Sequence, residues 1–374
     1  MNLKNKIIGV SVLILLIILI SFNIRNTSPT VKIAGLLPLT GGLASYGEPA
    51  KMVSDLAVEE INKSGGINGK KLEIVYEDHK CDPKAAVTSF EKVISVDKIN
   101  IAFMVACSGT VTAIAPNLET KNIAVVGTVT SANKLSGISP NFFRNWASDG
   151  LESKLLAEYI VDKGYKSVAV IYEDTDYAKG LKISLEDYLK NSDVKIYGES
   201  FTSGSTDVRT QLAKIQSNKP DVIFISVQTV TSGELVLTQM ENLNLKFPLL
   251  VSDNIIKSSS IIANHKSILE GAIGGDYVFI KTDKLDSIMK AYKDKYGADC
   301  PQINICAAQY DAIQLIAGAL KEKGNSAKDV IKYLKVLQYQ GASGDVSFDS
   351  KNDRDNANYS LFEIKDGEVV VIGK

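Results

Sequence analysis

The feature that most constrains the fold is an alternation of strand-like and helix-like segments, which occurs twice along the chain. In the first series, short apolar runs such as 31–37 and 101–106 precede stretches with apolar residues three and four apart. A second series begins near residue 167 and continues to 251. Strands that alternate with helices are joined by right-handed crossovers, so each series predicts a parallel sheet flanked by helices. Two series predict an α/β protein with two lobes, and small ligands commonly bind in the cleft between lobes.

The remaining elements follow from the same patterns. Residues 359–372 are typical of a hairpin that turns at Asp366-Gly367. Residues 349–358 are rich in Asp and Asn, but Ala357 stands where a calcium loop needs a ligand, so we expect a solvated turn. The predicted strands are 31–37, 72–76, 101–106, 123–127, 167–172, 194–200, 222–227, 247–251 and 274–280. The predicted helices are 48–61, 83–96, 110–118, 177–190, 208–217, 232–242, 286–296, 305–321 and 327–337.

The strand 101–106 ends in a stretch suited to an anion. Ser108, Gly109 and Thr110 follow it and lead into a helix. A helix N-terminus offers free backbone N–H groups and a favourable dipole, hydroxyls add donors, and Gly109 lets the backbone approach a ligand closely. We therefore expect a binding site for a carboxylate here, although an ordinary helix cap would have the same short sequence.

Composition excludes several classes of protein. The chain has 374 residues, 45% of them hydrophobic, and a formal net charge of -1, which suffices for a large core and more than one domain. Its lysines are interleaved with acids and form no basic block, so we expect no nucleic-acid partner. No G-x-S-x-G or G-x-G-x-x-G motif follows a strand, so we expect neither an enzyme nor a nucleotide cofactor. The absence of C-x-x-C and the distance in sequence between His79 and His265 argue against zinc.

The N-terminus predicts export. Lys4 and Lys6 precede an apolar run from Ile7 to Ile20, and positive charge before such a run holds that end in the cytoplasm. The rest of the chain would then lie outside the cytoplasm. No alanine precedes Ala34 and no cysteine precedes Cys81, so an A-x-A cleavage site and a lipid-modified cysteine are both missing. We expect residues 1–30 to be an uncleaved membrane anchor with a short linker, with a cleaved signal peptide as the alternative.

Four cysteines on an exported chain favour disulfides. Spacing permits three connectivities, of which we favour Cys81 with Cys107 and Cys300 with Cys306. Four buried thiols would require a reducing compartment instead.

Several stretches together resemble a known family. They are GLLPLTGGLASYG, INKSGGINGKKLEIVYEDHKCDPKAAV, ACSGTVTAIAP, YEDTDYAKGL and FDSKNDRDNANYSLFEI, which lie in order between Val31 and Ile372. They resemble the leucine/isoleucine/valine-binding proteins, the branched-chain amino-acid receptors of ABC importers. The resemblance implies a type I periplasmic-binding-protein fold with three hinge crossings, near Trp146, Tyr277 and Phe348. Lobe 1 would comprise 31–146 and 277–348, and lobe 2 would comprise 147–276 and 349–374.

The resemblance also implies a binding site and supports one disulfide. Relatives carry the Cys81–Cys107 bridge at matching positions, whereas the Cys300–Cys306 pairing rests on spacing alone. Ser108 would hold the carboxylate of an amino acid. A backbone carbonyl and a hydroxyl, two residues apart at Thr128 and Thr130, would receive its ammonium, and an acid from lobe 2, Asp253, would close over the ammonium. Relatives often have glutamate there, so this side chain is shorter by one methylene. Tyr46 and Tyr177 match aromatic positions of the cleft, and Gln228 stands where another aromatic is common.

The chemistry of these residues suits a zwitterion. A free amino acid carries a carboxylate and an ammonium on one carbon, so its receptor needs hydrogen-bond donors next to acceptors. We therefore expect a receptor for a branched-chain or similarly apolar amino acid, which delivers it to an ABC permease and ATPase. A ligand-binding sensor, or a receptor for an amide, urea or a small organic acid, is the alternative. Without the resemblance, we would interpret Asp253 as a helix-capping acid. Thr128 and Thr130 are equally explained as exposed strand residues, and Tyr46 and Tyr177 as aromatics of the core or of a lobe surface.

Overall fold

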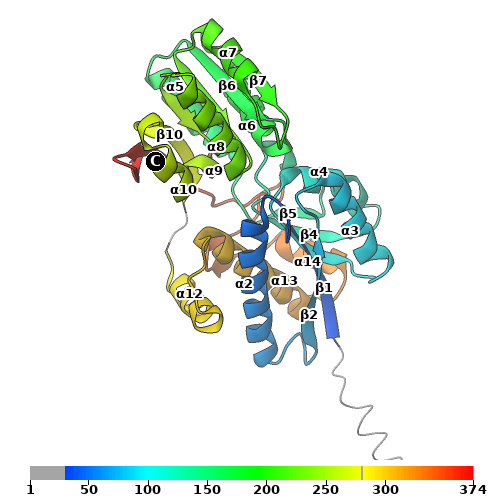
Figure 1. The fold of residues 1–374 in the computed structure, drawn as a ribbon. Helices are drawn as coiled ribbons and strands as arrows, with labels where there is room; N and C mark the ends of the chain where they lie inside the picture. The colour runs from blue at the N-terminus through cyan, green and yellow to red at the C-terminus, as the bar shows by residue number, and fades with distance from the viewer. Residues whose placement is uncertain (1–29, 279–280, 374) are drawn as a thin grey trace, which may run out of the picture.

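Two sheets, each flanked by helices, build the computed structural model, which describes residues 30–278 and 281–373 (Figure 1). The first sheet is parallel and has the strand order β2-β1-β3-β4-β5. The second has the order β14-β13-β10-β9-β8-β6-β7, in which β6 to β10 are parallel and the C-terminal hairpin β13–β14 is antiparallel. The predicted α/β fold with two parallel-rich sheets is confirmed. The predicted anchor segment lies outside the described residues.

Lobe 1 is the part of the molecule around the first sheet. Its first series of elements runs β1 (Thr30–Leu37), α2 (Ala44–Lys63), β2 (Lys71–Asp78), α3 (Pro83–Ser95), β3 (Ile101–Val105), α4 (Ser108–Leu118), β4 (Ala124–Thr128), the 3₁₀ turn η1 (Asn133–Leu135) and β5 (Phe142–Arg144). The chain returns to it later with α12 (Asp283–Tyr296), α13 (Ile303–Glu322), α14 (Ala327–Leu334) and the small hairpin β11 (Tyr339–Gly341) and β12 (Gly344–Val346).

Lobe 2 surrounds the second sheet. It contains α5 (Asp149–Asp162), β6 (Ser167–Glu173), α6 (Asp176–Leu189), β7 (Lys195–Phe201), α7 (Arg209–Asn218), β8 (Val222–Ser226), α8 (Val230–Asn242), β9 (Leu249–Val251), α9 (Asp253–Ile256), α10 (Ser259–Asn264), α11 (Lys266–Leu269), β10 (Ile273–Tyr277), β13 (Tyr359–Lys365) and β14 (Glu368–Gly373). The chain thus passes between the two sheets three times. The positions of the lobe boundaries near Trp146, Tyr277 and Phe348 stay a prediction.

Side-chain alternation along the central strands explains why helices cover both faces of each sheet. In β3, Phe103 and Val105 pack in the core beneath α2 and α13, whereas Ala102 and Met104 pack beneath α3 and α4. In lobe 2, α7 and α8 cover one face of the sheet, and α5 and α6 cover the other. Strands buried on both faces are apolar throughout, and for this reason they were recognisable as continuous apolar runs.

Some elements differ from the prediction. The helix expected from Glu48 begins at Ala44 and contains Pro49, and the helix α5 was not predicted. The hairpin at the C-terminus is confirmed, with Asp366 and Gly367 both at positive φ in its turn. The expectation of a solvated turn over 349–358 is wrong in part, because Asn352 and Arg354 are each only 5% exposed.

The segment around Asn352 and Arg354 is buried because it pairs with the end of β5. Arg144 is fully buried, and its guanidinium donates to Asp353 Oδ1 at 2.8 Å and lies 2.7 Å from Asp353 Oδ2. The same guanidinium donates to the backbone carbonyls of Ser131 and Ala132 at 2.8 and 2.9 Å. Arg144 therefore joins the loop after β4 to the last crossing between the lobes.

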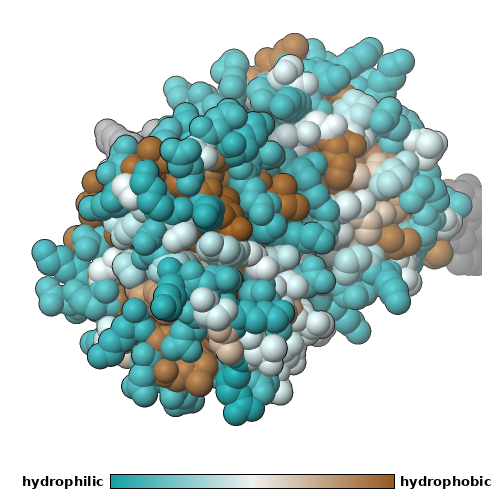
Figure 2. Space-filling view, turned by 90° about the horizontal axis from the view of Figure 1, so that it is seen from above, coloured by the Kyte–Doolittle hydropathy of each residue, from teal (hydrophilic) through white to brown (hydrophobic). Residues whose placement is uncertain are grey.

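The face of the molecule that is seen from above in Figure 2 is mainly polar. In the view of Figure 2, hydrophilic side chains cover most of the face, and apolar residues form separate patches. Among the helices in residues 30–278 and 281–373, none is both long and apolar enough to cross a membrane.

We predict that Arg144→Met lowers the free energy of unfolding by about 3–5 kcal/mol, because it leaves Asp353 and two carbonyls without their buried cation. Urea unfolding followed by circular dichroism measures the change. Arg209→Met is the matched control, because Arg209 pairs with Asp207 on the exposed surface and its loss should leave the midpoint unchanged. Equal midpoints for both variants would contradict a role for Arg144 at the crossing.

Candidate functional site

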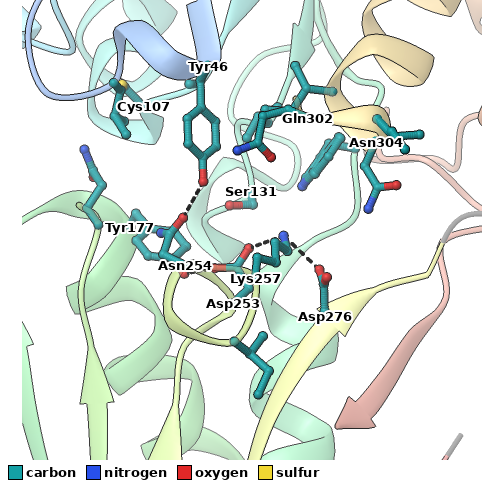
Figure 3. A pocket seen from close by; sticks show the side chains of 18 of the residues that line it. Tyr46, Cys107, Ser131, Tyr177, Asp253, Asn254, Lys257, Asp276, Gln302 and Asn304 are labelled. Carbon is teal, nitrogen blue, oxygen red and sulfur yellow. Dashed lines mark hydrogen bonds and ion pairs between the residues drawn. The ribbon is translucent and has the colours of Figure 1, made fainter. Parts of the chain in front are cut away.

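A cavity of about 410 Å³ lies where the carboxyl ends of strands from both sheets meet. Side chains of both lobes line it, as Figure 3 shows. Lobe 1 contributes Leu43, Tyr46, Ala106, Cys107, Ser108, Val129, Ser131, Trp146 and residues 301–305, and lobe 2 contributes Tyr177, Gln228, Asp253, Asn254, Ile256, Lys257, Asp276, Phe362 and Val369. Of the predicted ligand-binding residues, the cavity brings together Tyr46, Ser108, Tyr177, Gln228 and Asp253.

The loop after β3 presents Ser108 to the cavity in a constrained conformation. Ala106 and Cys107 adopt positive φ values of 62° and 63°, which non-glycine residues rarely do, and the Cys81–Cys107 disulfide closes this turn. Ser108 then begins α4, and its Oγ accepts a hydrogen bond from the Ala132 N–H at 3.0 Å. That bond uses an acceptor site of the hydroxyl and leaves its O–H able to donate to an anion.

Thr128, Thr130 and Gly109 do not line the cavity. The Thr128 and Thr130 hydroxyls are buried and have no hydrogen-bond partner among the residues that the structure describes. Val129 has a φ of 60°, so the chain turns after β4, and Val129 and Ser131 face the cavity instead. Thr130 Oγ1 turns back towards Gly127, where it would lie 2.5 Å from an added Cβ. Direct ligand contacts by these threonines and by Gly109 stay predictions.

Three charged side chains dominate the lobe 2 side of the cavity. Lys257 Nζ lies 2.8 Å from Asp253 Oδ2 and 2.8 Å from Asp276 Oδ1, so one ammonium bridges two carboxyl groups (Figure 3). Burial raises the pKa of Asp276 to about 6, against the opposing effect of Lys257, so this group is ionised at pH 7. Burial lowers the pKa of Lys257, but Asp253 and Asp276 outweigh it and hold that pKa well above its usual value. Two carboxylates and one ammonium leave one negative charge in excess.

Aromatic and amide side chains join the lobes around these charges. Tyr46 of lobe 1 donates to Asn254 Oδ1 of lobe 2 at 2.8 Å, and burial raises the pKa of Tyr46 to about 12. Tyr177 donates a hydrogen bond to Asp253 Oδ1. Gln228 Nε2 lies 2.9 Å from Cys81 Sγ across the gap. Asp253 is therefore held by Tyr177 and Lys257 together, and its carboxylate has a defined orientation.

Two further acids lie beneath the cavity, on the first turn of α5. Asp149 and Glu152 are fully buried, and no described residue makes a hydrogen bond of ordinary geometry to either carboxyl group. Burial and Asp253 raise the pKa of Asp149 to about 8, although the nearby Ser131 hydroxyl acts in the opposite direction. Burial, Asp253 and Asp149 raise the pKa of Glu152 well above its usual value. Burial therefore favours the protonated, uncharged form of both carboxyl groups.

Sequence reasoning missed Ser131, Asn254, Lys257, Asp276 and the cavity-lining residues 301–305. One signal was available for Lys257, which stands four residues after Asp253 and so shares a helical face with it. Asp276 and Asn304 are distant in sequence from the other residues of the site, and only the folded chain brings them near. The predicted disulfides Cys81–Cys107 and Cys300–Cys306 are both present.

A family model described as periplasmic binding protein matches residues 30–368. The chain belongs to this family. The Leu/Ile/Val-binding protein of Citrobacter freundii is 26% identical over 371 residues, which cover 97% of each chain. These are binding proteins of transporters rather than enzymes, and the chain is accordingly an ABC-transporter solute-binding protein of extracytoplasmic location.

Solved structures share the fold. A leucine-binding protein of Thermotoga maritima superposes with a TM-score of 0.80 at 21% identity and covers 92% of this chain and 98% of its own. A solute-binding protein of R. palustris in complex with benzoate superposes with a TM-score of 0.77 at 18% identity and covers 92% of this chain and 96% of its own. Ligands therefore differ among proteins of this fold, and the cavity itself must indicate the ligand.

We predict that Asp149→Asn stabilises the protein increasingly as the pH rises. The folded Asp149 keeps its proton up to a pKa of about 8, whereas the unfolded chain releases it near pH 4. Between pH 4 and pH 8, Asp149 therefore lowers the free energy of unfolding of the wild type by about 1.4 kcal/mol for each pH unit. Asparagine does not titrate, so the variant does not lose this stability. Denaturant titrations at pH 4, 6 and 8 measure the difference. The control is Asp162→Asn, which changes an exposed residue of the same helix. If the free energy of unfolding changed with pH in the same way in wild type and Asp149→Asn, the expectation would be wrong.

Proposed function

We propose that this protein captures an amino acid in the cavity between its lobes and delivers it to an ABC importer. The observation that supports this most directly is the excess negative charge of the Asp253–Lys257–Asp276 group, opposite the hydroxyl donor Ser108. A ligand with both an ammonium and a carboxylate matches this pair of features. A simple carboxylic acid would bring a second negative charge to Asp253 and leave the excess uncompensated.

The ligand carboxylate would lie at Ser108, near the first backbone N–H groups of α4. Its ammonium would share Asp253 with Lys257, and in doing so it would neutralise the group. Thr128 and Thr130, the two residues that the family resemblance assigns to the ammonium, would need a local rearrangement to reach it. Charge-assisted hydrogen bonds contribute roughly 1.5–3 kcal/mol each, so these anchors would supply much of the affinity.

The ligand side chain would lie against the apolar part of the wall. Leu43, Trp146, Ile256 and Phe362 lie in the same cavity, which supports a branched-chain or similarly apolar amino acid as one class of ligand. Burial of a leucine-sized side chain contributes roughly 1.5–3 kcal/mol, a gain comparable to that of one polar anchor.

Lobe closure would couple binding to recognition by the permease. Ser108 belongs to lobe 1 and Asp253 to lobe 2, so one zwitterion can bind both only when the lobes are close. That difference in affinity is what shifts a population towards the closed form. The permease and ATPase would act on the closed, loaded protein. Residues 1–30, as an uncleaved anchor, would hold the protein at the extracytoplasmic surface of the membrane.

We predict that Asp253→Asn weakens amino-acid binding by roughly 10- to 100-fold, the equivalent of one charge-assisted hydrogen bond. The substitution leaves Lys257 and Asp276 as a neutral pair with no charge for a ligand ammonium. Trp146, the only tryptophan of the chain, lies in the cavity and provides a fluorescence readout alongside calorimetry. The exposed Asp207→Asn on lobe 2 is the control. An affinity that Asp253→Asn leaves unchanged would remove this residue from the site.

A further inference from the structure

One segment of the cavity wall is a covalently closed loop. The Cys300–Cys306 disulfide encloses residues 301–305, and all five of them line the cavity. Cys300 and Cys306 are buried, and the last residues of the loop already form the first turn of α13. The loop is thus held at both ends, which fixes the side chains that it presents and reduces the entropy lost on binding.

The loop presents two carboxamides that the protein itself does not use. Gln302 and Asn304 are partly exposed, and among the described residues neither side chain makes a hydrogen bond. Figure 3 shows both side chains pointing into the cavity from lobe 1, above Lys257 and Asp276 of lobe 2. Each of these two amides has a carbonyl that accepts hydrogen bonds and an NH₂ that donates them. Both amides face the carboxylate of Asp276 and the ammonium of Lys257 across the cavity (Figure 3).

This end of the cavity suits a neutral polar group. Once the ligand ammonium is bound, it compensates the single excess negative charge of Asp253, Lys257 and Asp276. A ligand with a charged side chain, such as lysine or glutamate, would then bring an uncompensated charge into a partly buried space. A carboxamide brings none. Its NH₂ can donate to Asp276 or to an amide carbonyl, and its carbonyl can accept from Lys257 or from an amide NH₂.

We propose that the Cys300–Cys306 loop is a specificity element whose Gln302 and Asn304 extend the ligand range to amino acids with a carboxamide side chain, of which glutamine is the test case. The proposal rests on the proposed function, since the amino-acid backbone must first be anchored at Ser108 and Asp253. The apolar wall would contact the methylenes of such a side chain, and the loop would bind its end.

Calorimetry with the full extracytoplasmic chain tests this with leucine, glutamine and glutamate. We expect glutamine to bind at least as tightly as leucine and glutamate to bind at least 10-fold more weakly than glutamine. In Gln302→Leu/Asn304→Leu, we expect the affinity for glutamine to fall at least 10-fold, because the ligand amide loses its partners, while leucine binding is retained or improved. Retained leucine binding also shows that the variant is folded.

The matched control is Gln216→Leu/Asn218→Leu, which makes the same changes at the same spacing on the exposed surface of α7. It should leave the ratio of the two affinities unchanged. Binding of leucine without measurable binding of glutamine, or an unchanged ratio in Gln302→Leu/Asn304→Leu, would overturn the role of the loop and leave the proposed function intact. Failure of both amino acids to bind the wild type would contradict the proposed function itself and the loop proposal with it.

Discussion

Two carboxylates that share one lysine ammonium leave a negative charge in the cavity, and the recognition of a ligand that we propose depends on that charge. Lys257 lies 2.8 Å from both Asp253 and Asp276, so it reduces their mutual repulsion and holds both near the same point. Burial raises the pKa of both Asp149 and Glu152 and so favours their uncharged forms, which add no negative charge to this group. A cation that enters the cavity therefore meets one unit of opposite charge in a fixed position.

The scaffold keeps this group opposite the donors of lobe 1. The Cys81–Cys107 disulfide closes the turn that carries Ser108, and Arg144 holds the carbonyl of Ser131 in the adjacent loop. Arg144 also pairs with Asp353, in the segment where the chain returns to lobe 2. The geometry of the cavity is therefore tied to the crossings between the lobes, and a movement of the lobes changes the distance between its donors and its acceptors.

Apolar periodicity was sufficient to predict an α/β protein with two lobes, because strands buried on both faces leave continuous apolar runs and their helices leave apolar residues three and four apart. The three crossings between the lobes were expected only from the family resemblance. Ser108 was also predictable from its place directly after a strand, since parallel strands bring their carboxyl ends to one edge, whereas Asp253 was assigned to the site only through the family resemblance. Lys257, Asp276 and Asn304 were not, because partners far apart in sequence leave no local pattern. The side-chain directions of Thr128 and Thr130 depend on the positive φ of Val129, which no propensity predicts for a β-branched residue.

The most direct test of the charge-based recognition compares leucine with 4-methylpentanoate, which has the same carbon skeleton and carboxylate but no ammonium. Calorimetry on the wild-type protein at pH 7 should show leucine binding at least 100-fold more tightly than 4-methylpentanoate, because only leucine compensates the excess negative charge held by Asp253, Lys257 and Asp276. Equal affinities for the two compounds, or tighter binding of 4-methylpentanoate, would contradict the assignment of this charge to a ligand ammonium.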